Sequence, residues 1–353
     1  MKHRIGVGFA VTSFVSCSSE PMSHAQESAN VAILATGGTI AGSAESQTAA
    51  GYMSGQVAVD VLLNAVPELD TLANVTGEQI ASIGSQNMND TVWLALARRI
   101  NELAETDVDG IVITHGTDTM EETAYFLSLV VHTDKPIVMT GAMRPSTSIS
   151  ADGPANIYNA VAVAADPRAV GLGVMVVMND EIHDAHSVYK TNTTEVSTFQ
   201  SVEGLIGEVQ FGQARYFRSP YSRHTTTSNF TIEGVESLPQ VDIIYMHQGV
   251  SGALIDAAVA AGAKGVVTAG VGNGNMTDEA LTSLTAAAAA GVVSVRSSRV
   301  PTGVIGRMVE IDDDALGLVA SYGLSPQKAR ILLRLALLTT SDPGTIQQYF
   351  AEY

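Results

Sequence analysis

Hydroxyl side chains follow the first buried strand expected in this chain, at a turn that contains two adjacent glycines. The apolar run at residues 31–34 predicts a buried parallel strand, and it leads into Thr36, Gly37, Gly38 and Thr39. Adjacent glycines let a backbone turn sharply and approach a ligand closely. Open α/β sheets bind ligands at the carboxyl ends of their strands. Thr39 is therefore a candidate nucleophile, with a purely structural turn or a phosphate loop lacking its lysine as the alternatives.

A second polar cluster follows the strand expected over residues 110–114. It contains His115, Thr117 and Asp118, and it leads into a helix expected over residues 120–131, whose first turn is acidic as the helix dipole favours. Hydroxyls, a carboxylate and a histidine therefore crowd one turn between a strand and a helix. A second cluster of this kind favours chemistry over a structural role for both turns.

The two turns resemble the threonine signatures of the bacterial L-asparaginase and glutaminase family, in particular its type II, periplasmic members. They read TGGTIAG at 36–42 and HGTDTMEET at 115–123. The resemblance covers nearly all of the chain from about residue 30 onward. It continues, in the family's order, through GSQNMND at 84–90, TGAMRPSTSISADGP at 140–154, KTNTT at 190–194, AGVGNGN at 269–275 and SSRVPTG at 297–303.

The resemblance implies an amidohydrolase, EC 3.5.1.1, that converts L-asparagine to L-aspartate and ammonia through a covalent acyl-threonine intermediate. It also implies some activity on L-glutamine, and neither a cofactor nor a metal. Such a reaction needs an activated nucleophile, an oxyanion site and a proton donor for the leaving nitrogen. A glutaminase-asparaginase of balanced specificity is the alternative within the family, although asparagine at position 275 resembles the relatives that prefer asparagine.

Four positions of the first domain match catalytic residues of the family. Thr39 matches the first catalytic threonine, and Tyr52 would belong to a mobile lid made of small residues that excludes water once substrate is bound. Thr117 and Lys190 would activate water or the second chemical step. The residues themselves leave two roles open for Lys190, as the proton acceptor or as a fixed positive charge.

The same resemblance supplies substrate-binding positions. Ser85 and Gln86 match residues that hold the α-carboxylate and amine of the substrate, and Asp118 matches one that binds its α-amino group. Ala142 matches a position whose backbone faces the substrate amide.

Two further positions come from the second domain. Asn275 would bind substrate and Glu310 would act in catalysis by contacting the lid tyrosine, each reaching the active site of a neighbouring subunit. Family resemblance thus implies a homotetramer assembled as a dimer of close dimers.

The N-terminus is typical of a secretory signal peptide. Lys2 and Arg4 precede an apolar run at residues 5–15, and a plausible cleavage site ends at Ala25. The run is too short to span a membrane. We therefore expect residues 1–25 to be removed and the mature protein to be periplasmic, with no membrane attachment.

Cys17 is the only cysteine, and it offers an alternative in which the exported protein is a lipoprotein. No intramolecular disulfide is possible, so stability must come from the core and the interfaces. The formal net charge of −18 argues against nucleic acid or an anionic membrane as a partner and leaves a small-molecule substrate as the expected one.

Alternation of apolar strands and helices predicts an α/β fold with two domains. Residues 26–220 would form a larger domain with a mainly parallel sheet flanked by helices, residues 221–240 a linker, and residues 241–353 a smaller α/β domain. Strands are expected at 80–86, 110–114, 136–140, 172–178, 241–246, 265–268 and 292–295, and helices at 57–66, 89–100, 120–131, 154–164 and 278–290.

Other patterns are weaker. His183 and His186, with Glu181 and Asp184, sit in a loop-like segment and lack a further cluster of metal ligands. The glycine-rich 271–276 departs from the dinucleotide fingerprint, which disfavours a nucleotide-dependent enzyme. A periplasmic amino-acid-binding protein is the rival from outside the enzymes, and release of ammonia from asparagine would exclude it.

Overall fold

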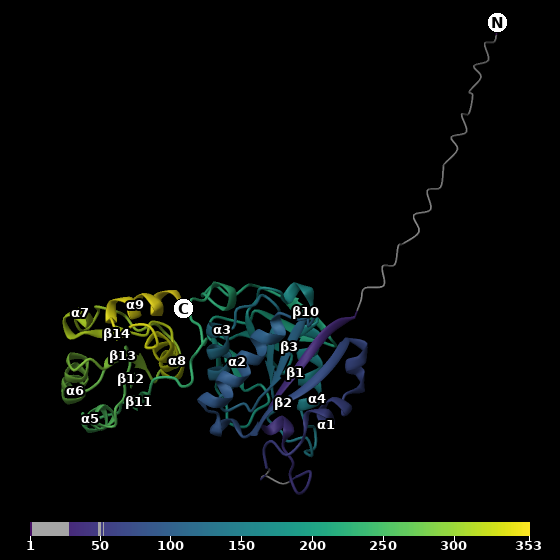
Figure 1. Cartoon of the computed structure of the whole chain (residues 1–353), viewed down its shortest axis with the longest axis horizontal. Helices are drawn as coiled ribbons and strands as arrows, with labels where there is room; N and C mark the ends of the chain where they lie inside the picture. The colour runs from purple at the N-terminus through teal and green to yellow at the C-terminus, as the bar shows by residue number, and fades with distance from the viewer. Residues whose placement is uncertain (2–27, 49–50, 52) are drawn as a thin grey trace.

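The computed structural model describes residues 1, 28–48, 51 and 53–353, and it shows two α/β domains side by side (Figure 1). Tyr52 and nearly all of the expected signal peptide lie outside the described residues. Within the described part of the chain, no helix has the length and apolarity needed to cross a membrane.

The larger domain is built on an eight-stranded sheet in the order β10-β9-β6-β5-β4-β3-β1-β2, with a separate two-stranded ribbon of β7 and β8. Neighbouring strands from β2 to β5 are parallel, and β6, β9 and β10 add antiparallel pairs at one edge. The strands are β1 (Ala29–Gly37), β2 (Ala73–Ile83), β3 (Gly110–Thr114), β4 (Ile137–Thr140), β5 (Val174–Met178), β6 (Glu181–Asp184), β7 (Val188–Lys190), β8 (Phe199–Ser201), β9 (Gly207–Gln210) and β10 (Gln213–Tyr216).

Both faces of this sheet are covered, so its central strands are apolar at successive positions. Along β1, Val31 and Ile33 pack into the core on the α4 side, whereas Ala32 and Leu34 pack into the core with α2 and α3. The helices of this domain are α1 (Val59–Asn64), α2 (Asp90–Ala104), α3 (Met120–Val130) and α4 (Gly153–Ala164).

The smaller domain has a four-stranded parallel sheet in the order β11-β12-β13-β14. Helices α5 and α6 pack on one face of it, and α8 and α9 pack on the other. The elements are β11 (Val241–Tyr245), α5 (Ala253–Ala260), β12 (Gly265–Gly270), α6 (Asp278–Ala289), β13 (Val293–Ser298), α7 (Asp313–Leu316), β14 (Leu318–Ala320), α8 (Pro326–Ala336) and α9 (Pro343–Glu352).

Helix α8 joins the two domains, because it packs against the small sheet on one side and against α3 on the other (Figure 1). One continuous apolar core runs through this contact. The Arg334 guanidinium of α8 also donates to both carboxylate oxygens of Asp90 at the start of α2, at 2.9 and 2.6 Å. A bidentate pair of this kind is among the stronger polar contacts, so the domains are held in one relative orientation.

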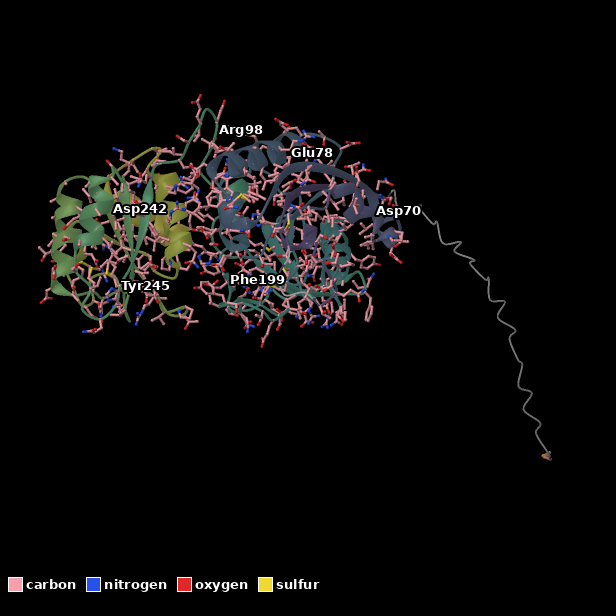
Figure 2. All side chains as sticks on the ribbon, turned by 90° about the horizontal axis from the view of Figure 1, so that it is seen from below. Asp70, Glu78, Arg98, Phe199, Asp242 and Tyr245 are labelled. Atoms are coloured by element: carbon pink, nitrogen blue, oxygen red, sulfur yellow. The ribbon has the colours of Figure 1, made fainter. Side chains whose placement is uncertain are left out.

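The segment predicted as a linker lies against the larger domain. The Ser228 hydroxyl donates to the carbonyl of Leu129 at 2.5 Å, and Arg98 of α2, labelled in Figure 2, donates to the carbonyl of Val235. Because of these contacts, the segment that connects the two domains packs against the larger domain instead of forming a free linker.

The predicted fold class, a larger mainly parallel sheet domain followed by a smaller α/β domain, is confirmed. The expected strand at 80–86 is wrong in its extent, because β2 begins at Ala73 and residues 85–87 form a 3₁₀ turn. The helix expected at 57–66 is shorter, spanning Val59–Asn64. The antiparallel strands β6 to β10, and the helices α5, α8 and α9, were not predicted.

Candidate active site

The two threonine turns touch through their glycines. Gly38 has φ +80° and donates its N–H to the carbonyl of Ile83 at 2.9 Å, which ties the end of β1 to the end of β2. A Cβ added at Gly38 would lie 2.4 Å from the Cα of Gly116, closer than real Cβ contacts. Only glycine permits this approach, and it places the turns that carry Thr39 and Thr117 directly against each other.

Ser85 connects a third turn, at the end of β2, to the same place. Its hydroxyl accepts the N–H of Asp118 at 3.2 Å, and its carbonyl accepts the hydroxyl of Thr119 at 2.9 Å. Gly116 again leaves room, since a Cβ there would lie 2.6 Å from the Ser85 hydroxyl. The side chains of Thr39, Ser85 and Thr117 are therefore gathered at one edge of the sheet and are all buried.

Lys190, the last residue of β7, contacts the turn that carries Thr117. Its ammonium donates to the hydroxyl of Thr117 at 2.9 Å and to the carboxylate of Asp118 at 2.7 Å. The lysine side chain is 16% exposed and that of Asp118 is 61% exposed. A proton can pass between hydroxyl and amine at this distance, while the exposed carboxylate remains accessible to a cationic group of a ligand.

His115 is completely buried and supports the second turn from behind. Its Nδ1 lies 2.7 Å from the carbonyl of Gly116, and its Nε2 lies 2.9 Å from the hydroxyl of Thr123, which also accepts the indole N–H of Trp93 at 2.8 Å. Burial lowers the pKa of His115 to about 4, so the ring is neutral at pH 7. Because the Gly116 carbonyl can only accept, Nδ1–H donates to it, and Nε2 of the neutral ring accepts the hydroxyl of Thr123.

Two further predicted positions lie close to these turns. Ala142, just beyond β4, is fully buried, and a Cβ added at Gly153 would lie 3.6 Å from its methyl group and 3.1 Å from Ile40, the residue after Thr39. Gln86 is exposed, and its side-chain amide lies over the backbone of Gly84.

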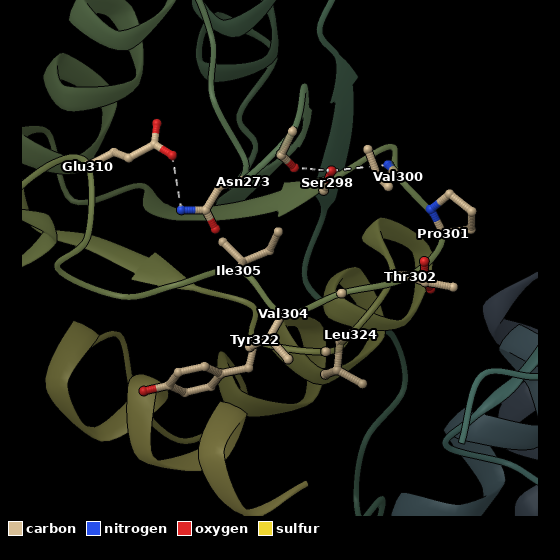
Figure 3. Close-up of a pocket in the computed structure, with 14 residues that line it drawn as sticks. Asn273, Ser298, Val300, Pro301, Thr302, Val304, Ile305, Glu310, Tyr322 and Leu324 are labelled. Atoms are coloured by element: carbon tan, nitrogen blue, oxygen red, sulfur yellow. Dashed lines mark hydrogen bonds between the residues drawn. The ribbon is translucent and has the colours of Figure 1, made fainter. Parts of the chain in front are cut away.

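Asn275 and Glu310 lie on the smaller domain. The amide of Asn275 donates to the Glu310 carboxylate at 2.6 Å, and Asn273 approaches the same carboxylate at 3.5 Å. Figure 3 shows Glu310 beside a pocket of about 450 Å³, on the side away from the ribbon of the larger domain. Among the described residues, neither side chain has a hydrogen bond to the threonine turns of its own chain. The predicted Tyr52 lies outside the described residues.

Two of the possible metal ligands, His183 and Asp184, are bonded to other side chains. Asp184 accepts bonds from Ser187 at 2.6 Å and Arg218 at 2.8 Å, and His183 is bonded to Ser201 at 2.9 Å. In the part of the chain that the structure describes, no group of three or more His, Cys, Asp or Glu residues could hold a metal ion.

Comparison with known proteins places the whole arrangement in a family. The asparaginase N-terminal model matches residues 30–222, and the glutaminase/asparaginase C-terminal model matches residues 240–350. This chain belongs to the asparaginase family. As a family member it is 54% identical to L-asparaginase 2 of Escherichia coli (strain K12), over 92% of this chain and 93% of the relative.

Two further members of the asparaginase family carry names that differ in location. The chain is 53% identical to the probable periplasmic L-asparaginase of Haemophilus influenzae, over 94% of this chain and 95% of the relative. Its fold is similar to the crystal structure of the probable cytoplasmic L-asparaginase of Campylobacter jejuni, with a TM-score of 0.90 and 46% identity, covering 92% of this chain and all of that one.

One residue that contacts the site was not among the predicted ones. Glu121 of α3 is buried and accepts the backbone N–H of Lys190 at 2.5 Å. Its position in the first turn of a helix is explained by the helix dipole alone, so the sequence carries no separate signal of this contact.

Proposed function

We propose that this protein hydrolyses L-asparagine to L-aspartate and ammonia through an acyl-threonine intermediate, with lesser activity on L-glutamine. The observation that carries the proposal is the meeting of two threonine turns with a lysine and a carboxylate, in a chain of the asparaginase family. The glutaminase in the description of the C-terminal model supports the second substrate.

In the first step, the Thr39 hydroxyl oxygen attacks the carboxamide carbon of the substrate. The carbon–nitrogen bond breaks, and nitrogen leaves as ammonia after taking up a proton, which leaves an ester on Thr39. Free backbone N–H groups at such a turn are suitable donors for the oxyanion that forms in between, whereas the N–H of Gly38 is already bonded to Ile83. Tyr52 and Glu310 complete this half of the site in the proposal, with the tyrosine on a closing lid.

In the second step, water attacks the ester and releases aspartate and the free Thr39 hydroxyl. The Thr117 hydroxyl, bonded to Lys190 at 2.9 Å, is suitably placed to take part in moving the proton of that water. The exposed Asp118 carboxylate would bind the α-amino group. Ser85 and Gln86 would contact the amino-acid end of the substrate, and Ala142 its amide.

The proposal includes assembly. Asn275 and Glu310 are bonded to each other on the smaller domain, and Glu310 lies on the side away from the larger domain of its own chain (Figure 3). We propose that they complete the site of a neighbouring subunit in a homotetramer made of two close dimers.

Export to the periplasm is proposed from the N-terminal sequence and from the name of the Haemophilus influenzae relative. Residues 2–27 lie outside the described part of the chain, and the Campylobacter jejuni neighbour is called cytoplasmic. Mass determination of the protein recovered from an osmotic-shock fraction tests this: a chain beginning at Gln26 supports export, and a full-length chain retained in the cytoplasm contradicts it.

The test of function is ammonia release from L-asparagine with no cofactor or metal added. We expect turnover by the wild type, no turnover by Thr39→Ala, and partial turnover by Thr39→Ser, which keeps a hydroxyl. Thermal unfolding midpoints serve as the control for folding. Binding of asparagine without ammonia release by the wild type would instead support an amino-acid-binding protein, and a Thr39→Ala rate within about tenfold of wild type would exclude Thr39 as nucleophile.

A further inference from the structure

Lys190 lies on one of the shortest strands of the protein. Strand β7 spans three residues, Val188–Lys190, and pairs only with β8, outside the eight-stranded sheet. A lysine side chain has many rotamers, and catalysis needs its ammonium held at Thr117 and Asp118. Because the backbone of β7 is not paired with the main sheet, other contacts must hold it in place.

Glu121 supplies one of these contacts, because its two carboxylate oxygens face different elements. One oxygen accepts the backbone N–H of Lys190 at 2.5 Å, and the other accepts the side-chain amide of Gln327 at 2.6 Å. The Glu121 side chain is buried, so each lost bond would leave an unpaired charged group away from water. Gln327 belongs to the first turn of α8, in the smaller domain.

The next residue of α8 contacts β7 directly. The Lys328 ammonium donates to the carbonyl of Val188 at 2.6 Å and to that of His186 at 2.7 Å, and it lies 5.9 Å from the centre of the Tyr125 ring. Lys328 is 2% exposed, and burial lowers its pKa to about 8, which still leaves it mostly charged at pH 7. Hydrogen bonds from a buried ammonium to two carbonyl oxygens are strong, because the donor is charged.

We propose that the first turn of α8 positions Lys190 for the reaction, through Gln327 and Glu121 at the Lys190 N–H and through Lys328 at the start of β7. In this role the smaller domain acts on the site of its own chain, in addition to any contribution to a neighbour. The inference rests on the proposed function, because it explains how the lysine of that function is held.

Two neighbouring glutamates beside Lys190, Glu121 and Glu122, allow matched substitutions, because both line the same hollow of about 410 Å³. Among the described residues, the Glu122 carboxylate has no hydrogen bond to any other group. Glu121→Gln keeps an acceptor for the Lys190 N–H and an amide that can pair with Gln327, whereas Glu121→Ala keeps neither. Glu122→Gln controls for loss of a carboxylate in the same hollow.

The experiment measures kcat, KM and the thermal midpoint for each variant of the full-length protein. We expect Glu121→Ala to lower kcat by at least about tenfold with a much smaller change in KM, since a lysine displaced by a fraction of an ångström loses proton-transfer geometry while most substrate contacts remain. Glu121→Gln and Glu122→Gln should stay within about threefold of wild type. A purely structural role would instead lower the midpoint and leave kcat of the folded fraction unchanged, which would overturn the proposal.

A second variant removes only the contact from the smaller domain. Gln327→Leu should lower kcat in the same direction as Glu121→Ala, while Gln348→Leu, at an exposed glutamine of α9, should not. If Glu121→Ala does not fold, Gln327→Leu still tests whether α8 positions Lys190. A wild-type kcat in Gln327→Leu would contradict that role of α8. Failure of the wild type to release ammonia would reject the proposed function itself, which separates the two inferences.

Discussion

At the scale of single residues, the turn at the end of β3 contains polar groups with different tasks. Thr117 and Asp118 face Lys190, whereas His115, two residues before Thr117, is buried and bonded to Gly116 and Thr123. The sequence places all three side chains in one turn but does not show which of them is buried. Burial decides the outcome, because it keeps the imidazole neutral and makes it a support for the turn.

His115 predicts a specific loss of stability in acid. Its pKa is about 4 in the folded protein and 6.5 when unfolded, so between these values the unfolded chain binds more protons. The free energy of unfolding should therefore fall as the pH is lowered from 6.5 toward 4, with a contribution from this residue on the order of 3 kcal/mol. Urea unfolding of the wild type and of His115→Gln at several pH values measures it. Between pH 6.5 and 4, the free energy of unfolding should fall less steeply for His115→Gln than for the wild type. Parallel plots of the free energy of unfolding against pH for the two proteins would contradict the prediction.

At the scale of elements, the apolar strands that carry the threonine turns could be predicted, because strands covered on both faces are apolar at successive positions. The full length of strand β2 was harder to predict. This strand lies at the edge of the sheet and carries polar residues such as Asn74, Thr76 and Glu78, so only its apolar end suggested a strand. Helix α8 was missed for a related reason: Lys328 and Arg334 are buried there by partners from the other domain, which no local pattern reveals.

The contact between the two threonine turns predicts a sharp dependence on Gly38. Gly38→Ala would place a Cβ 2.4 Å from the backbone of Gly116, so the turns must separate, and we expect activity to fall by at least about a hundredfold. Gly234→Ala is the matched control, because Gly234 also has positive φ, at +71°, but nothing lies within 4 Å of its added Cβ. It should lose about 1 kcal/mol of stability and little activity. Equal losses in both variants would show that backbone strain, and not the contact between turns, is responsible.

At the scale of the whole molecule, the candidate residues of the two domains that the structure describes form no hydrogen bond with each other within one chain. Thr39 and Thr117 are at the edge of the large sheet, whereas Asn275 is bonded to Glu310 on the small domain, and Figure 3 shows Glu310 on the side away from the large domain. The order of these motifs could be read from the sequence of one chain. In the proposed shared site, however, they would meet through contacts between chains, which follow from surface shape and not from any local pattern. The proposed shared site would give Asn275 and Glu310 a role that their bond within one chain does not explain.

The shared site predicts complementation between two inactive variants. Thr39→Ala and Glu310→Ala homo-oligomers should each lack a complete site. Random co-assembly should restore about a quarter of the sites, since half of the dimers are mixed and one of their two sites combines an intact Thr39 with an intact Glu310. Ammonia release is measured first for Glu310→Ala alone, which must be impaired, and then for the co-expressed mixture, with separately purified proteins combined just before the assay as the control. An impaired Glu310→Ala protein with no recovery after co-expression would place Glu310 in the site of its own chain, and full activity from a monomer in light scattering would exclude a shared site altogether.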